Sequence, residues 1–260
     1  MMETPLYQEA ARPVVFEADC EGYSYWGLGS SVLVWHADTY FWVTAKHVME
    51  KQSQSFETLR IFPADASRMS LPFNALCKIN TPDPEEEFAD LYILQINLAE
   101  FASSGDAPLT AQDLAEGTYC TDNLSAGDDL LIVGYPEESR SVDYEQFKIK
   151  YKRHILPAVF VGPGSQRHCY QLRIKDNLGL STYNGLSGSP IFRIVTVGSF
   201  AYPMFVGLLL RGSAESQIGH FVGSQVISHA TKEAGASSAD AQQGAPGDVF
   251  ASASRRQIRT

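Results

Sequence analysis

Short runs of apolar and β-branched residues, separated by glycine, proline and polar turn residues, mark most of the chain. Runs of this kind favour strands joined by turns over long helices. A glycine-rich turn over 27–30 leads into an apolar run ending at Trp35, and a second run covers 40–45, so we expect a hairpin. Further strands are predicted at 14–16, 56–63, 72–79, 91–96, 129–134, 156–161, 168–174, 191–195, 203–210 and 220–222.

The two ends of the chain lack this strand pattern. Residues 1–13 are expected to form an arm, since two prolines there oppose a helix. One helix is predicted over 225–234, where Ser224 could cap its start and Gly235 end it. Residues 235–260 are mostly Ala, Ser, Gly and Gln. Because these few apolar residues cannot offset the entropy lost when the chain is ordered, we expect a flexible tail.

The 260 residues are 44% hydrophobic, enough to bury a large core in one β-rich unit of two sub-barrels or in two small domains. A net charge of −10 argues against binding the phosphate backbone of nucleic acid. No run reaches the roughly 18 apolar residues that cross a bilayer, and the chain opens without a leader pattern. These features predict an all-β, cytoplasmic protein that binds neither nucleic acid nor membrane.

The cysteines give no sign of a disulfide framework or a metal site. They are scattered and include no Cys-x-x-Cys pair: Cys20, Cys77, Cys120 and Cys169. In a chain expected to be cytoplasmic they are predicted to be buried thiols. The same spacing argues against zinc, so neither a metal nor another cofactor is predicted.

One stretch late in the chain carries the pattern of a catalytic serine. The segment Tyr183-Asn184-Gly185-Leu186-Ser187-Gly188-Ser189-Pro190 places Ser187 between two glycines, just before an apolar run. A serine hydroxyl is a weak nucleophile until a base removes its proton and donors receive the charge on the attacked carbonyl. On its own the motif also fits a glycine-rich turn with a structural serine. The catalytic interpretation therefore needs a base elsewhere in the chain.

A histidine and an aspartate are the candidates for that base and its orienting partner. His47 follows the 40–45 strand in the sequence Thr44-Ala45-Lys46-His47, although an isolated histidine there is commonly just a partly buried polar residue. Asp90 directly precedes a mostly apolar strand, and a buried carboxylate without a partner is very costly. Asp90 therefore needs a partner, and His47 is the natural candidate.

The order of these three residues separates them from other serine-hydrolase layouts. His47, Asp90 and Ser187 are separated by 43 and 97 positions and follow the chymotrypsin-type order, unlike the subtilisin and α/β-hydrolase orders. An α/β-hydrolase elbow would also need glycine where this chain has Ser189, and a late histidine within alternating strands and helices. We therefore reject the elbow.

With the His47 segment and the serine motif, the chain resembles trypsin-like (chymotrypsin-fold) serine proteases over about residues 22–234. The resemblance implies two packed six-stranded antiparallel β-barrels within a protease domain of residues 14–234. The first barrel would cover about 22–100 and the second about 118–223. A connection rich in small residues would join them, and the short C-terminal helix would close the pair.

The resemblance also assigns roles. His47 would take the Ser187 proton as general base and return it to the leaving amine. Asp90 would hold the imidazole tautomer and stabilise the imidazolium. The N–H groups of Gly185 and Ser187 would form the oxyanion hole. These roles imply a serine endopeptidase that cleaves protein or peptide substrates through an acyl-enzyme, without a metal or cofactor.

Within that family the motif is nearest to bacterial glutamyl endopeptidases, which share a serine at the place of Ser189 and a pair like Ser181-Thr182. Those enzymes carry a histidine on the strand after the nucleophile, where this chain has leucines at 208–210. The expected pocket therefore accepts an apolar or small polar side chain and does not select glutamate. Its predicted residues are Ser181, Thr182, Leu210, Gly212 and His220.

A second departure from the family concerns activation. In animal members activated by cleavage, an aspartate directly before the nucleophile pairs with the new N-terminus. This chain has Leu186 at that position and no Ile-Val-Gly-Gly-like start. Its oxyanion hole is therefore expected to be preformed, or to be set by substrate or by a regulatory partner whose identity is unknown.

Two other functions stay open at this point. The chain could be a protease-fold interaction module with little turnover, although such a module has no need to keep His47, Asp90 and Ser187 together. It could also be a protease restricted to itself or to one partner in a bacterial stress or defence system.

Overall fold

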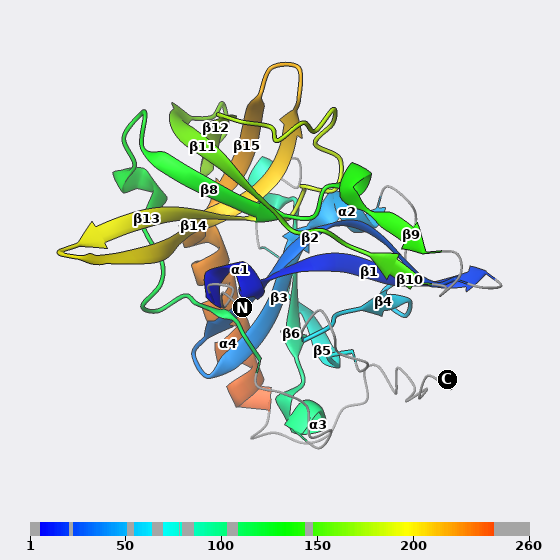
Figure 1. Cartoon of the computed structure of the whole chain (residues 1–260). Coiled ribbons are helices and arrows are strands. Elements are labelled where there is room, and N and C mark those ends of the chain that lie inside the picture. Colours follow the sequence, from blue (N-terminus) through cyan, green and yellow to red (C-terminus); the bar gives the residue numbers. More distant parts are fainter. Residues whose placement is uncertain are drawn as a thin grey trace.

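The computed structural model is a β-rich fold in two halves, the first from β1 to β7 and the second from β8 to β15 (Figure 1). The fold is 49% strand and 18% helix, so the all-β expectation holds in this coarse form. The structure describes residues 6–20, 23–50, 55–63, 70–77, 79, 86–102, 109–143 and 148–241.

The first half is an open sheet whose strands run in the order β4-β1-β2-β3-β6-β5, with β7 pairing in parallel with β2. These strands are β1 (Ala11–Cys20), β2 (Tyr23–His36), β3 (Thr39–Ala45), β4 (Leu59–Arg60), β5 (Phe73–Cys77), β6 (Leu91–Ile96) and β7 (Gln112–Asp113). Short helical segments lie between them: α1 (Leu6–Ala10), α2 (Lys46–Glu50), η1 (Glu87–Ala89) and α3 (Leu98–Ala102).

The predicted hairpin forms as β2 and β3. Its turn residues Ala37 and Asp38 have positive φ angles of 48° and 59°, the backbone of a two-residue turn whose twist matches that of the strands. Its register pairs His36 with Thr39. The continuous apolar run of β3 has a physical cause, because this strand is buried on both faces after its first two residues.

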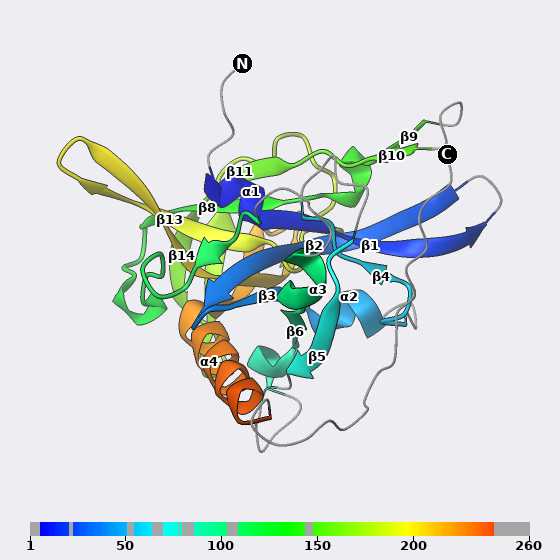
Figure 2. The same ribbon diagram turned by 90° about the horizontal axis from the view of Figure 1, so that it is seen from below.

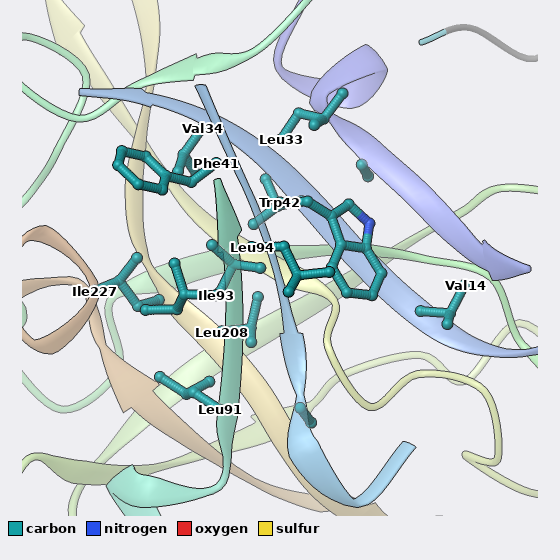
Figure 3. Packing of buried hydrophobic residues seen from close by; sticks show 14 of the residues in the cluster. Val14, Leu33, Val34, Phe41, Trp42, Leu91, Ile93, Leu94, Leu208 and Ile227 are labelled. Atoms are coloured by element: carbon teal, nitrogen blue, oxygen red, sulfur yellow. The ribbon is translucent and has the colours of Figure 1, made fainter. Parts of the chain in front are cut away.

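The core of the first half continues into the second half (Figure 3). Phe41, Trp42 and Ile93 are fully buried. Leu208 of β14 and Ile227 of α4 belong to the same cluster. The two halves therefore share one continuous apolar core.

The second half is a closed antiparallel barrel with the strand order β11-β12-β15-β14-β13-β8. Its strands are β8 (Asp129–Gly134), β11 (His154–Pro163), β12 (Cys169–Ile174), β13 (Pro190–Val197), β14 (Phe200–Ser213) and β15 (Ile218–Gly223). The far ends of β13 and β14 project from the barrel as a hairpin (Figure 1). Smaller elements precede and flank the barrel: η2 (Thr121–Asn123), η3 (Glu137–Ser139), β9 (Ser141–Asp143) and β10 (Lys148–Lys150).

The expectation of two closed barrels is met only by the second half. Among the described strands of the first half, nothing joins the outer strands β4 and β5, so the sheet stays open. β4 is two residues long and pairs only with β1, at Val15 and Phe16. The pairings among the described strands therefore do not close the first half into a barrel.

Residues 6–13 differ from the expected arm, because they form α1 and the start of β1. Ala10 and Ala11 are fully buried, and small side chains let the chain run inside the core. Pro13 pairs with Ser30 of β2, at a point where β4 does not flank β1. Its missing N–H therefore removes no hydrogen bond on that outer side.

The helix α4 (Ser224–Ala241) begins where the sequence predicts and continues through the expected end at Gly235. Ser224 does not cap it through its hydroxyl, which donates to Tyr119 O over 2.9 Å. The helix lies beside the first sheet (Figure 2). Its buried hydrophobic side chains are Val226, Ile227 and Ala230. Residues 242–260 of the predicted tail lie outside the described residues. No described helix is long and apolar enough to span a membrane.

Candidate active site

Strand register brings His47 and Asp90 together. β3 pairs antiparallel with β6 so that Ala45 lies opposite Leu91. His47 follows β3 as the second residue of α2, and Asp90 immediately precedes β6. The main chain links the two segments as well, since Asp90 O accepts a hydrogen bond from Lys46 N over 3.1 Å. The two side chains therefore start from adjacent ends of a strand pair.

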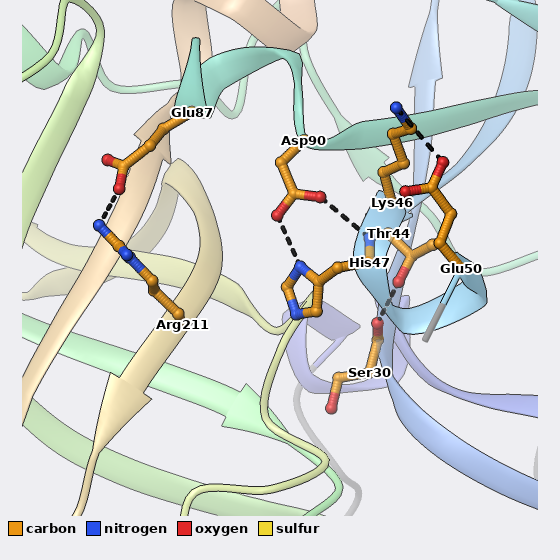
Figure 4. Close-up of polar contacts among 8 residues, drawn as sticks. All are labelled: Ser30, Thr44, Lys46, His47, Glu50, Glu87, Asp90 and Arg211. Atoms are coloured by element: carbon orange, nitrogen blue, oxygen red, sulfur yellow. Dashed lines mark hydrogen bonds and ion pairs between the residues drawn. The ribbon is translucent and has the colours of Figure 1, made fainter. Parts of the chain in front are cut away.

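The Asp90 carboxylate holds His47 at two points (Figure 4). Its Oδ2 lies 2.6 Å from the imidazole Nδ1, and its Oδ1 accepts the main-chain N–H of His47 over 2.9 Å. Because an ionised carboxylate can only accept, the neutral tautomer of His47 that fits this contact carries its proton on Nδ1 and its lone pair on Nε2. The His47 and Asp90 side chains are 23% and 30% exposed. Solvent and substrate can therefore reach the pair.

The loop that carries Ser187 lies against the first half. Ser187 O accepts the N–H of Ser30 over 2.9 Å. A Cβ built on Gly29 would lie 3.2 Å from Ser187 O and 2.6 Å from Cγ1 of Val48, the residue after His47. Ser187 is itself partly exposed. The structure therefore places Ser187 on the same part of the first half as His47.

The imidazole of His47 hydrogen-bonds to Asp90, and the described hydrogen bonds include none from His47 to Ser187. Contacts between a nucleophile and its base are often long without substrate and tighten when substrate binds. The structure thus brings the predicted base and orienter into direct contact, and it places the predicted nucleophile nearby without a direct bond.

Gly185 and Ser187 each carry a main-chain N–H that has no acceptor among the described residues. Gly185 has a φ of +86°, and a Cβ there would lie 2.6 Å from Glu137 N, so the position requires glycine. Asn184 O accepts that same Glu137 N–H over 2.8 Å. The N–H and C=O of a trans peptide point in opposite directions, so the Gly185 N–H faces away from Glu137. Two such free donors are what an oxyanion hole requires.

Leu186, between these two residues, is fully buried in the apolar core of the barrel. Its N–H donates to Tyr183 O over 3.1 Å, and its C=O accepts Ser189 N–H over 3.0 Å. An acidic side chain in that place would be costly without a partner. The residue directly before Ser187 is therefore held by apolar burial and by main-chain hydrogen bonds.

Ser181, a predicted pocket residue, is bound to a carboxylate that the sequence analysis did not identify. Glu138 of η3 accepts the Ser181 N–H over 2.6 Å and the Ser181 hydroxyl over 2.5 Å. Hydrogen bonds from Ser181 lower the pKa of Glu138 below its ordinary value. Thr182 is exposed beside it, and its Oγ1 accepts Asn184 N–H over 3.3 Å. No local sequence pattern indicates this contact, because Glu138 is one of several charges in a loop predicted to be exposed.

The other predicted pocket residues are not all available to a substrate. Leu210 is 2% exposed and belongs to the core shared with the first sheet, so it offers no surface. Gly212 is exposed, and a Cβ there would lie 3.1 Å from the Tyr183 ring. His220 is half-buried on β15, opposite Arg211 of β14. Gly212 and the Tyr183 ring are therefore neighbours, whereas Leu210 points into the core.

The turn that carries Asp90 is anchored to the second half. Glu87 of η1 forms an ion pair with Arg211 of β14 (Figure 4). The ring of Phe88 packs edge-on against His168, with ring centroids 5.7 Å apart. The Glu87 side chain is only 17% exposed, although its acidic stretch resembles a solvated surface loop. The turn before Asp90 is therefore in contact with the second half as well, through Glu87 and Phe88.

No protein-family model matches the chain, and no curated protein matches it significantly. The likeness to trypsin-like proteases thus rests on the motifs, their order and the geometry around His47, Asp90 and the serine loop. The closed six-stranded barrel of the second half is compatible with a chymotrypsin-like fold.

Proposed function

We propose that the protein is a serine endopeptidase of the trypsin-like type, with Ser187 as nucleophile, His47 as general base and Asp90 as its orienting partner. The observation that carries the proposal is the double hydrogen bond between His47 and Asp90, which leaves Nε2 free to accept a proton. The loop beside it offers two unpaired N–H groups, as an oxyanion hole requires.

Acylation would use these groups in turn. Ser187 Oγ bonds to the carbonyl carbon of the scissile peptide while its proton passes to His47 Nε2. The carbonyl electron pair moves onto the oxygen, which receives hydrogen bonds from the N–H groups of Gly185 and Ser187. Asp90 stabilises the imidazolium through Nδ1. As the C–N bond breaks, the leaving amine takes the proton from Nε2.

Deacylation would run the same groups with water as nucleophile. His47 Nε2 takes a proton from water as the water oxygen attacks the ester carbonyl. When the bond from the carbonyl carbon to Ser187 Oγ breaks, the proton returns from Nε2 to Oγ and the acid is released. Apart from this water and the substrate, each step uses side chains and main-chain groups of this chain.

Glu138 supports a preference other than glutamate at the residue before the scissile bond. Its carboxylate binds Ser181, shortly before the serine motif, and its lowered pKa keeps it ionised at neutral pH. A negative charge beside the pocket would repel an acidic side chain. We therefore propose protein or peptide substrates with an apolar or small polar residue at that position.

Labelling with a fluorophosphonate tests the proposal directly. The wild type should label, and Ser187→Ala should lose both the label and about 10⁵–10⁶-fold of the peptide hydrolysis rate. Ser189→Ala is the matched control because Ser189 is fully buried and its hydroxyl has no hydrogen-bond partner among the described residues, so this variant should label like the wild type. Label that persists in Ser187→Ala would refute the nucleophile. An unlabelled wild type would favour an interaction module without turnover.

A further inference from the structure

Ser30 of β2 is fully buried and hydrogen-bonds to the serine loop of the other half through its main chain and its side chain. Its N–H donates to Ser187 O over 2.9 Å, and its Oγ donates to Gly185 O over 2.7 Å. The same Oγ accepts Tyr135 N–H over 2.8 Å. The C=O of Ser30 accepts the Thr44 hydroxyl over 2.7 Å (Figure 4). Ser30 of the first half thus hydrogen-bonds to both Gly185 and Ser187, the two residues whose N–H groups are the proposed oxyanion donors.

The carbonyls of four consecutive residues, 184–187, all accept hydrogen bonds. Those of Gly185 and Ser187 accept from Ser30, and the other two accept from main-chain N–H groups of the second half over 2.8 and 3.0 Å. Each trans peptide points its N–H opposite to its C=O. The two bonds within the second half therefore set the directions of the free N–H groups of Gly185 and Ser187. The two bonds from Ser30 fix the peptides that follow each donor.

Two glycines give this loop a conformational freedom that its hydrogen bonds must restrict. Gly185 and Gly188 have φ angles of +86° and +87°, and glycine populates both signs of φ with little penalty. A rotation of either peptide held by Ser30 would leave a buried carbonyl and a buried donor unpaired, which is unfavourable. The loop also packs closely on this residue, since a Cβ on Gly188 would lie 1.9 Å from Ser30 O.

We propose that Ser30 is a positioning residue that keeps the oxyanion hole of the free protein in its working geometry. In animal proteases activated by cleavage, an ion pair between the new N-terminus and the residue before the nucleophile has this role. Here that residue is the buried Leu186, which cannot form an ion pair, and Ser30 takes over the role. A hydroxyl is needed at this position, since it donates to Gly185 O and accepts Tyr135 N–H at once. The inference rests on the proposed protease function and adds how the site is held ready without N-terminal cleavage.

Ser30→Ala, compared with Ser31→Ala, tests this role. Ser31 is the next residue of β2 and is also fully buried, but its hydroxyl donates to Arg12 O of β1 over 3.0 Å. Ser30→Ala should lower kcat about 10²-fold, the lower end of the loss of one oxyanion donor, with KM within about threefold of wild type. Ser31→Ala should keep both constants within about threefold. The inhibition constant of a peptide boronate, a tetrahedral transition-state mimic, should rise with Ser30→Ala by the factor that kcat/KM falls.

Three results would overturn the proposal: a kcat for Ser30→Ala equal to that of Ser31→Ala, a loss confined to KM, or unchanged boronate inhibition. If Ser30→Ala does not fold, Thr44→Val decides, because it removes the hydroxyl bound to Ser30 O and keeps the side-chain volume. It should lower kcat about tenfold at unchanged KM, and an unchanged kcat refutes the role. A wild type that fails to label with fluorophosphonate refutes the protease itself, whereas a labelled wild type with an unaffected Ser30→Ala refutes only the role of Ser30.

Discussion

The two halves of the molecule hold their parts of the candidate site by different means. In the first half, His47 and Asp90 lie at adjacent ends of β3 and β6, and the pairing of these strands sets their separation. In the second half, Ser187 lies in a glycine-rich loop before β13, and Ser30 of the first half fixes that loop. One part of the site follows from strand register, the other from a few contacts between distant segments.

This difference determines what a substitution should do. A residue at the end of a strand pair is held by many main-chain hydrogen bonds, so exchanging its side chain leaves the backbone in place. The serine loop depends on hydrogen bonds from residues far away in the chain, so we expect one lost bond or one steric overlap to shift it. Changes at His47 and Asp90 should therefore act on the chemistry, and changes in the serine loop should act first on geometry and stability.

Of the substitutions that test this comparison, Asp90→Asn should give the largest effect, and it should act on the chemistry alone. The amide oxygen can still accept the main-chain N–H of His47, but the NH₂ group cannot accept from Nδ1 and favours the wrong imidazole tautomer. We expect kcat to fall about 10⁴-fold with little change in melting temperature. Steady-state kinetics and thermal melts measured on the same preparation check this. A melting temperature that falls together with kcat would show that Asp90 holds the first half together, contrary to the comparison.

The parts of the site that could be predicted from the sequence are those held by strand pairing, because strands leave local patterns in the sequence. The hairpin of β2 and β3 was visible in its apolar runs and turn, and Asp90 was conspicuous because a charge directly precedes a buried strand. Both signals are local in the sequence. The contact between Asp90 and His47 followed from the cost of burying a lone carboxylate, and the structure contains it.

The remaining parts depend on partners far away in the chain. Ser30 has the sequence context of a glycine-rich turn, and its bond to Gly185 spans 155 positions. Glu138 stands in a mixed-charge loop with no local sign of Ser181. The first barrel was expected by resemblance, and the pairings among the described strands show an open sheet there. None of these contacts leaves a periodic pattern, so propensity and spacing carry no information about them.

Gly188→Ala tests the second half and should act on stability. At this position φ is +87°, and a Cβ would lie 1.9 Å from Ser30 O and 2.5 Å from Oγ1 of Thr44. Backbone strain and overlap with a fixed carbonyl together should reduce the free energy of unfolding by about 3–5 kcal/mol. Urea unfolding measures this loss.

Gly198→Ala is the control for that change. Gly198 also has a positive φ, +62°, in the turn of the hairpin formed by β13 and β14, but a Cβ there would meet nothing within 4 Å. We expect a loss of about 1 kcal/mol, due to backbone strain alone. Equal losses in the two variants would mean that the serine loop yields as easily as an exposed turn, and the contrast between the halves would disappear.

Glu138→Gln should give the smallest effect, a change of specificity without a change of fold. Glutamine has the same shape and can still accept from Ser181, but it carries no charge. We expect kcat/KM for peptides with glutamate before the scissile bond to rise about 3–10-fold, and kcat/KM for apolar residues there to stay unchanged.

The bonds from Ser181 lower the pKa of Glu138 from its ordinary 4.5, so the wild-type carboxylate stays ionised above that pH. The difference between wild type and variant should therefore be the same at about pH 6 and about pH 8. A peptide library profiled at both pH values measures it. A wild type that already prefers glutamate, or a variant with an unchanged profile, would show that the contact between Glu138 and Ser181 does not border the substrate pocket. Specificity would then have to come from the strands of the barrel, and the second half would position its pocket as the first half positions its base.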